Sequence, residues 1–404
     1  METDNSSALT IRDLPPEILH KIFYFIDLQE LCTSVSLVCK EWYEYAHSPV
    51  FWRYLNPKSQ NLSGTALKLL ASNAPLLKNL NLHGQSNICN EDLEYVFTNC
   101  PHIQELVLGF CSSLSDKLFE KFDIQQFCSC LTALNVEGNN WVNDDFIRTV
   151  SHMPKLRVLS LAYCRVTDAA MIFLANNLSC LESIDTDGAQ FINDEGIIYL
   201  VKKQNMSLRH LKVDGENLTD HSLQAVITNC KNLQTFHVSF AEMFTDEFVQ
   251  NLKDMQNLCN MKLKKATQLS QNTIIKLFRG SGLPRLTYLD LTECVEIGDE
   301  AVRQITLCCG KTLKSLMLCW CWNITDQGIC AIVDRCSNLE NLDLLGVDEI
   351  TGSSLDRIPE DLPKLTYLNL CQCNKIDDDL INELLRRKQD LKVINYYGEE
   401  FTVT

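Results

Sequence analysis

The chain has 404 residues, of which 46% are apolar, and its 36 Lys and Arg against 52 Asp and Glu give a formal net charge of -16. This length and composition allow a large buried core. The negative charge argues against general binding to nucleic acid or to an anionic membrane, because both surfaces would repel the chain.

The two ends of the chain show no targeting signal. Residues 1–10 have neither the basic region nor the apolar run of a secretory signal, and no run in the chain reaches the roughly 18 apolar residues that a membrane span needs. The last residues carry no prenylation box. We therefore expect a cytoplasmic and/or nuclear protein, whose 20 cysteines stay reduced.

The first 56 residues are unusually apolar. A helix is expected to start near Pro16, because proline is tolerated in the first turn of a helix. Between Ile18 and Ile26 six of nine residues are apolar, which is more than one buried stripe requires. A segment of about 40 residues cannot cover this surface from within, so we expect a second chain or the rest of the protein to cover part of it.

The same segment resembles an F-box, whose pattern is Leu-Pro-x-Glu-Ile/Leu, a spaced Leu, and Val-Cys-Lys/Arg-x-Trp. The matching residues are Leu14, Pro15, Glu17, Ile18, Leu31, Val38, Cys39, Lys40 and Trp42. The resemblance implies a short three-helix F-box over residues 8–56. It also implies docking on a Skp-family adaptor and, through it, on the cullin scaffold and RING subunit of an SCF-type ubiquitin ligase.

Seven residues are predicted to form the adaptor interface or its immediate support: Leu14, Pro15, Ile18, Ile22, Leu31, Val38 and Trp42. The alternative is a helical cap that only shields the first repeat of the following domain. A cap needs a polar outer face, whereas this segment has a second apolar one.

A linking helical cap is expected over residues 57–75, and a leucine frame with a period of about 26 residues then runs over 76–397. One copy reads Leu313, Leu316, Leu318 and then Cys321. Full copies start at Ile103, Leu156, Leu208, Leu286, Leu313, Leu339 and Leu365, and weaker ones at Leu76, Leu131, Leu181, Leu233 and Leu258. A half-copy starts at Leu391, and residues 398–404 are expected to be a tail.

Each repeat is predicted to be a strand followed by a helix. The alternation Leu316-Met317-Leu318 is typical of a strand, and pairs such as Thr325-Asp326 mark a helix start, because the hydroxyl can cap free amides and the carboxylate suits the helix dipole. Repeated in one sense, such units build an α/β solenoid with parallel strands on a concave face and helices on a convex face. The frame resembles the cysteine-containing class of leucine-rich repeat from about Leu76 to Tyr397.

No metal, cofactor or catalytic residue is predicted. Cys111, Cys164, Cys294, Cys321 and Cys373 occupy one column of the repeat alignment, where other repeats place Ala or Val. A zinc site cannot replace a thiolate by a methyl group, so these cysteines are expected to be small buried side chains. The eight histidines do not combine with a carboxylate and a nucleophile in a recognisable order.

The concave face is expected to bind a protein substrate through Phe240, Lys262, Lys264, Tyr288, Trp320 and Tyr367. Exposed aromatic side chains on a rigid face carry binding energy, although these rings could instead pack on neighbouring repeats. Phe240 and Trp320 belong to a column that alternates with glycines such as Gly188 and Gly346. The lysines could receive an acidic or phosphorylated segment, but they lack the bidentate fork of arginine.

These features together predict a non-catalytic substrate receptor of an SCF-type ubiquitin ligase, which binds a protein substrate for ubiquitination and proteasomal degradation. The alternative is a leucine-rich-repeat scaffold or inhibitor that masks a protein partner without ubiquitination. Neither hypothesis requires nucleic acid, a membrane or a cofactor.

Overall fold

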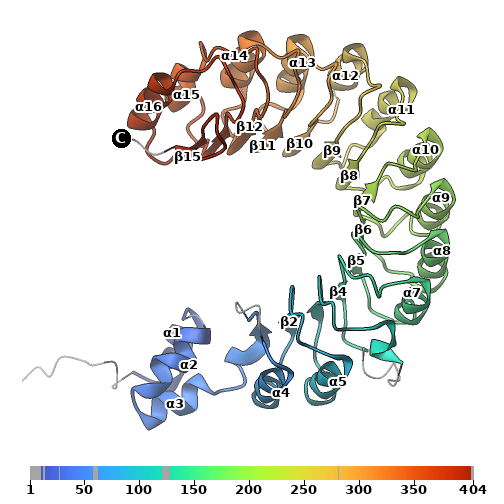
Figure 1. Cartoon of the computed structure of the whole chain (residues 1–404), viewed down its shortest axis with the longest axis vertical. Helices are drawn as coiled ribbons and strands as arrows, with labels where there is room; N and C mark the ends of the chain where they lie inside the picture. Colours follow the sequence, from blue (N-terminus) through green and yellow to red (C-terminus); the bar gives the residue numbers. More distant parts are fainter. Residues whose placement is uncertain are drawn as a thin grey trace, which may run out of the picture. The chain divides into compact units, whose positions relative to one another are not determined.

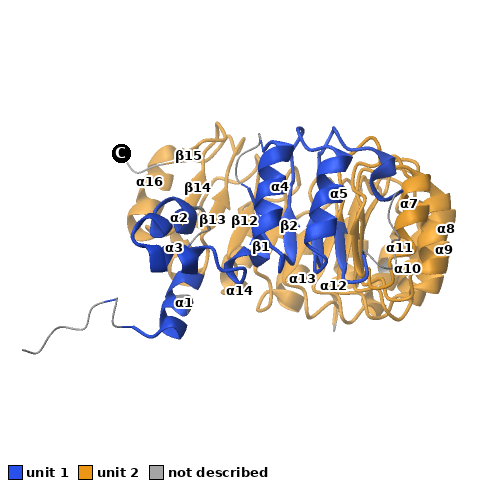
Figure 2. Ribbon diagram, turned by 90° about the horizontal axis from the view of Figure 1, so that it is seen from below, with its two compact units in different colours: residues 1–134 blue, residues 135–404 orange. Residues whose placement is uncertain are grey.

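The computed structural model describes residues 11, 14–26, 28–57, 62–120, 128–280 and 282–401. The chain divides into two compact units, Met1–Leu134 and Asn135–Thr404, which Figure 2 colours blue and orange. Each unit is described by itself below.

Unit 1 begins with a small helical segment. Its elements are α1 (Pro16–Tyr24), α2 (Leu28–Thr33), the 3-10 helix η2 (Val35–Leu37), α3 (Lys40–Ala46) and η3 (Phe51–Arg53). Phe23, Leu31 and Ala46 form its buried centre, and Trp42 and Tyr45 are among the side chains that pack against them. The three α-helices expected from the F-box resemblance are therefore confirmed.

The rest of unit 1 alternates strands and helices: β1 (Tyr54–Leu55), α4 (Gly64–Asn73), β2 (Asn79–Asn81), α5 (Asn90–Asn99), β3 (Glu105–Val107) and η4 (Asp116–Phe119). β1, β2 and β3 pair in parallel, with Leu55 opposite Leu80 and Leu80 opposite Leu106. The sheet thus begins at Tyr54, before the first leucine of the repeat frame. β4 (Ala133–Asn135) lies at the unit boundary in sequence.

Unit 2 is a stack of strand and helix repeats. Its strands are β5 (Val158–Ser160), β6 (Ser183–Thr186), β7 (His210–Asp214), β8 (Thr235–Ser239), β9 (Asn260–Leu263), β10 (Tyr288–Asp290), β11 (Ser315–Met317), β12 (Asn341–Asp343), β13 (Tyr367–Asn369), β14 (Lys392–Ile394) and β15 (Glu400–Phe401). Neighbours from β5 to β14 pair in parallel, whereas β15 pairs antiparallel to β14. A strand therefore lies within the segment expected to be a tail.

The helices of unit 2 follow the strands in the chain. They are α7 (Asp144–Val150), α8 (Asp168–Asn177), α9 (Asp194–Lys203), α10 (Asp220–Asn229), α11 (Asp246–Asn251), α12 (Gln271–Phe278), α13 (Asp299–Cys309), α14 (Asp326–Arg335), α15 (Ile358–Asp361) and α16 (Asp378–Arg387), with the 3-10 helices η5 (Leu252–Asp254) and η6 (Leu355–Arg357). Figure 1 shows the strands of this unit on its inner, concave side and the helices on its outer side. Strands about 4.8 Å apart and helices 8–10 Å apart require this curvature.

The core of unit 2 is the leucine frame. Leu313, Leu316 and Leu318 are fully buried, as are the corresponding residues of the neighbouring repeats. The predicted parallel α/β solenoid is therefore confirmed. In the part of the chain that the structure describes, no helix combines the length and the hydropathy needed to cross a membrane.

The helix-start aspartates join consecutive repeats. The Asp299 carboxylate at the start of α13 accepts hydrogen bonds from the Thr325 amide at 2.8 Å and from its hydroxyl at 2.7 Å, and Thr325 caps α14. The same link binds Thr167 to Asp144, Asn193 to Asp168, Thr219 to Asp194, Thr245 to Asp220, Ser270 to Asp246 and Thr351 to Asp326. These carboxylates therefore hold the next repeat as well as suiting the dipole of their own helix.

The cysteine column has a second role besides filling space. The thiol of Cys321 donates to the carbonyl oxygen of Leu291 in the preceding repeat at 3.3 Å. The thiols of Cys111, Cys164, Cys294 and Cys373 likewise donate to a carbonyl oxygen at or just after the end of the strand of the preceding repeat. Burial raises the pKa of the Cys164 thiol to about 11 and that of Cys373 to about 12. These thiols are protonated donors at neutral pH, which fits the structural role expected of them.

Candidate functional site

The helical segment of unit 1 exposes large apolar side chains. Phe25 is 87% exposed, Leu37 78% and Val38 55%. Ile18, Ile22, Tyr24, Tyr43 and Val50 are also exposed. Because so small a segment rarely leaves this much apolar surface in water, we treat this surface as a candidate protein-binding site and call it the helical face.

The predicted adaptor residues divide into two groups. Pro15, Ile18, Ile22 and Val38 are exposed and Leu14 is half-buried. Leu31 is buried in the core of the segment, and the Trp42 ring lies edge-on to Phe23 with 5.1 Å between ring centroids. Leu31 and Trp42 therefore support the helical face from beneath, and the other five residues lie on or at its surface.

Two exposed residues of the helical face were not among the predicted ones. Phe25 follows the end of α1 two positions after the buried Phe23, and Leu37 ends η2 next to Val38. In a helix, a residue two positions from a core residue points to the opposite side. The helical spacing from Phe23 could therefore have predicted that Phe25 is exposed. The exposure of Leu37 depends on a 3-10 turn that the F-box pattern does not reveal.

The second candidate surface is the strand face of unit 2. The register aligns Asp185, Lys212, His237, Lys262, Asp290, Met317, Asp343 and Asn369 across β6 to β13. Because side chains alternate along a strand, this line, here called the middle row, points away from the buried leucines. The predicted Lys262 belongs to it.

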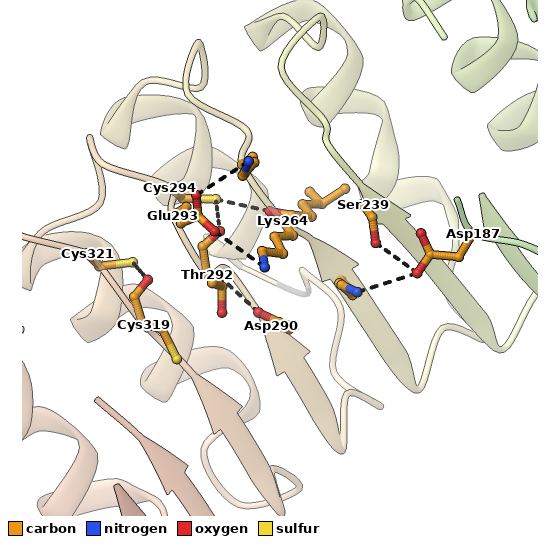
Figure 3. A network of polar contacts seen from close by, with 12 residues as sticks. Asp187, Ser239, Lys264, Asp290, Thr292, Glu293, Cys294, Cys319 and Cys321 are labelled. Carbon is orange, nitrogen blue, oxygen red and sulfur yellow. Dashed lines mark hydrogen bonds and ion pairs between the residues drawn. The ribbon is translucent and has the colours of Figure 1, made fainter. Parts of the chain in front are cut away.

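The lysines of the strand face are paired within the chain. Lys212 lies 3.0 Å from Asp185, Lys262 lies 3.8 Å from Asp187, and Lys264 lies 3.4 Å from Glu293. Figure 3 shows Lys264 directed toward Glu293, and Asp187 accepting a hydrogen bond from the Ser239 hydroxyl. The basic patch expected around Lys262 and Lys264 is therefore largely neutralised before any partner arrives.

His237 is neutral in this setting. Burial, and then the charges of Lys212 and Lys262 on either side, lower the pKa of the imidazole to about 4. Its ring lies 5.6 Å from that of Tyr288. Within the described residues, the buried Nε2 of His237 has no hydrogen-bond partner.

Tyr288 and Tyr367 are half-buried beside the middle row. The Tyr288 hydroxyl donates to Asp290 at 3.4 Å, and burial followed by the charge of Asp290 raises the pKa of the phenol. Burial and then the charge of Asp343 raise the pKa of Tyr367. Both phenols therefore stay protonated next to carboxylates.

Phe240 and Trp320 lie in the turns that follow their strands. Their φ angles are 55° and 58°, and Gly188 and Gly346, the glycines of the same column, have φ angles of 73° and 72°. The alternation of glycine with aromatic residues thus follows from a left-handed backbone position, which favours glycine. Phe240 lies under the ammonium of Lys265 at 4.6 Å and is still 39% exposed, and Trp320 packs against Gly346. Both rings therefore contact neighbouring repeats, and their role in substrate binding stays a prediction.

The described residues contain no group of three or more His, Cys, Asp or Glu side chains that could hold a metal ion. The helical face and the strand face offer apolar contact, charge and hydrogen bonding.

Two family models match the chain. Residues 11–58 match the F-box-like family, and residues 152–175 and 283–305 match a leucine-rich repeat. The first match covers the helical face, and the second covers repeats of unit 2.

Three relatives share low identity with the chain. The DNA repair protein rhp7 of Schizosaccharomyces pombe is 24% identical over 63% of this chain, the F-box protein SKIP19 of Arabidopsis thaliana 22% over 65%, and the F-box/LRR-repeat protein 4 of Bos taurus 25% over 55%. These matches cover 51%, 78% and 36% of the respective relatives. The chain thus spans about half the length of the repair protein.

The fold is similar to that in the crystal structure of the Rad7 and Elc1 complex in yeast. The TM-score is 0.57 at 21% identity, and the similarity covers 93% of this chain and 98% of the other. At this identity the likeness extends to the fold.

Proposed function

Because this chain is an F-box and leucine-rich-repeat protein, we propose that it is the substrate-recognition subunit of an SCF-type ubiquitin ligase. In this proposal the helical face binds a Skp-family adaptor, which connects the chain to the cullin scaffold and the RING subunit. The strand face of unit 2 binds a protein substrate.

The observation that carries the proposal is the exposed helical face inside the F-box match. Phe25, Leu37 and Val38 are apolar and mostly exposed, although three helices and a buried core are available to cover them. Burying apolar surface stabilises a complex by about 25 cal/mol per Å². An adaptor with an apolar groove would therefore gain affinity from these side chains.

The proposed mechanism is proximity. A receptor that holds adaptor and substrate at once raises the effective concentration of a substrate lysine near the charged conjugating enzyme. The chain supplies binding surfaces in this scheme, and the ligase partners supply the transfer of ubiquitin.

Adaptor binding tests the first half of the proposal. The intact chain, Leu37→Asp and Val38→Asp are titrated with a purified Skp-family adaptor by calorimetry. The matched control is Leu69→Asp, because Leu69 is 66% exposed on α4 of the same unit but lies outside the F-box match. We expect a loss of at least about tenfold in affinity for the two helical-face variants and no change for the control, where tenfold corresponds to about 1.4 kcal/mol.

If the intact chain does not bind the adaptor, the receptor hypothesis is wrong and the scaffold or inhibitor hypothesis is favoured. The second half is tested in cells, by affinity capture under proteasome blockade with the intact chain and with Val38→Asp, and then by the half-lives of the captured proteins without the blockade. Substrates are expected among the proteins that both forms retain and only the variant stabilises. If Val38→Asp stabilises none of the proteins it retains, the degradation role is wrong.

A further inference from the structure

The carboxylates of the strand face outnumber the cations that could neutralise them. Lys212 and Lys262 pair with Asp185 and Asp187, and Lys264 and Lys265 share Glu293. Among the described residues, no cation lies within 4.0 Å of the carboxylate oxygens of Asp214, Asp290 or Asp343. All three belong to strands of unit 2, so this face keeps negative charge that the fold does not neutralise.

The fold does not require charge at two of these positions. Each of the three carboxylates accepts a hydrogen bond from the amide two residues later, at 2.9 Å for Asp214, 2.9 Å for Asp290 and 3.1 Å for Asp343. Asn81, Asn135, Asn369 and Asn395 accept a bond from the amide two residues later as well, and Asn369 is in register with Asp290 and Asp343. Asp214 lies two residues beyond this row on its own strand. At the position of Asp290 and Asp343 a neutral amide oxygen therefore suffices for the turn, and the negative charge is an additional property of these two strands.

Asp214 also has an unused acceptor. The residue is only 7% exposed, yet within the described residues its Oδ2 has no hydrogen-bond partner. Burial, and to a lesser degree the charge of Asp187, raise the pKa of this carboxyl. An unpaired buried acceptor costs stability, and a donor from a partner would remove that cost.

Aromatic side chains accompany the acidic positions. Tyr288 and Tyr367 flank the part of the middle row that holds Asp290, Met317 and Asp343, where register places the two carboxylates on either side of Met317. Carboxylates beside aromatic rings suit the ammonium of lysine and the guanidinium of arginine. The chain itself contains one such contact, between Lys265 and the ring of Phe240.

We propose that the strand face of unit 2, from Asp214 on β7 to Asp343 on β12, binds a segment of a protein partner rich in arginine and lysine. This inference rests on the proposed function and specifies the substrate class of its second surface. Five inter-strand steps of about 4.8 Å separate β7 from β12, so an extended segment of about seven residues spans them. Arginine fits best, because its planar fork can approach a carboxylate and stack on a tyrosine at once.

Acidic and phosphorylated segments fit less well. Such a segment would have to displace Asp187 and Glu293 from the lysines that they pair with, and would then lie beside the three unpaired carboxylates. Repulsion of this kind rejects the wrong partner.

The test uses two fluorescent peptides of about 12 residues, one with arginine and one with glutamate at alternate positions, separated by glycine and serine. Binding to the full chain is measured by anisotropy at low and at physiological ionic strength. The variant Asp214→Asn/Asp290→Asn/Asp343→Asn removes three charges while keeping each turn acceptor. The control Glu195→Gln/Glu247→Gln/Glu383→Gln removes three exposed charges from α9, α11 and α16 of the same unit.

We expect the arginine peptide to bind the intact chain, more weakly at higher salt, and the strand-face variant to lose at least about tenfold in affinity. The helix variant should stay within about twofold of the intact chain. Stronger binding of the glutamate peptide, no binding of the arginine peptide, or equal losses in the two variants would overturn the inference. Adaptor binding by the same strand-face variant separates the two proposals. If the variant still binds the adaptor, the receptor role stands whether or not the peptides bind as expected.

Discussion

Asp92 on α5 and Lys68 on α4 form an ion pair of 2.8 Å within unit 1. The Asp92 carboxylate is almost completely buried, and it also accepts hydrogen bonds from the Cys89 amide at 3.0 Å and the Cys89 thiol at 3.1 Å. One side chain thus caps its own helix and holds the preceding one. Two consecutive helices of unit 1 are joined by a contact that the repeat frame alone does not contain.

The Asp92–Lys68 pair predicts a pH dependence of stability. Burial alone raises the pKa of Asp92, but the bonds from Lys68 and Cys89 outweigh it, so the folded pKa lies below the usual value. The stabilisation is therefore present above the unfolded pKa of about 3.9 and is lost as the pH falls through the lower folded value. In urea unfolding, Lys68→Met should destabilise the chain at pH 7 and progressively less as the pH drops toward 3. Lys117→Met, at an exposed lysine of the same unit, should show no such pH dependence.

Trp42→Ala should loosen the whole helical segment. Its partly buried ring packs on the buried Phe23, and removal of a fully buried aromatic ring costs about 3–5 kcal/mol, so we expect a loss toward the lower end of this range. Hydrogen exchange of the intact chain should become faster throughout α1 and α3. Val38→Asp changes only the surface, so its exchange should match that of the unaltered chain. If both variants exchange alike, the division into core and surface residues is wrong.

Asp299→Ala should weaken the junction between α13 and α14. The Asp299 carboxylate accepts from the Thr325 amide, the Thr325 hydroxyl and the Gly328 amide, so its loss leaves three donors without this partner. We expect a destabilisation of about 1–3 kcal/mol in chemical unfolding. The comparison is Glu296→Ala, an exposed residue of the same connection, which should change stability by less than about 0.5 kcal/mol.

Gly346→Ala should cost more than Gly280→Ala. Both glycines have a positive φ, 72° and 78°, so a side chain brings about 1–2 kcal/mol of backbone strain at either place. A Cβ on Gly346 would also lie 2.2 Å from the Trp320 ring, whereas a Cβ on Gly280 meets nothing within 4 Å. The difference in unfolding free energy between the two variants measures the ring contact. Combining Gly346→Ala with Trp320→Gly should abolish that difference.

Asp214→Asn should stabilise the fold at neutral pH. Because the folded pKa of Asp214 is raised, the folded state disfavours the charge, and stability falls as the pH rises from the unfolded pKa through the folded one. The neutral amide escapes this penalty. Thermal unfolding should give a higher midpoint for the variant at pH 7 and a smaller difference at pH 4. Equal midpoints at pH 7 would show that Oδ2 already has a donor in solution.

The leucine frame made much of the fold predictable, because burial follows a regular period. Leu313, Leu316 and Leu318 point into the core as a strand of that spacing requires, and Thr325 caps a helix as its position indicated. The F-box residues also indicated which segment would expose apolar surface. Leu31 and Trp42 could not be separated from Val38 by pattern, because all of them are apolar and only the packing around Phe23 distinguishes core from surface.

The charges of the strand face required the structure. In sequence, Lys262 and Lys264 form a basic cluster. Their partners Asp187 and Glu293, however, lie 75 residues before Lys262 and 29 residues after Lys264 along the chain. Likewise, a left-handed turn accounts for the alternation of Trp320 with glycines such as Gly346 in other repeats. The order of residues along the chain was enough to predict periodic burial, helix caps and the apolar N-terminal segment. Coulomb energy depends on the distance between charges in space, not along the chain. Which charges remain unpaired therefore depends on distances across several repeats, and the stacking of the strands sets those distances.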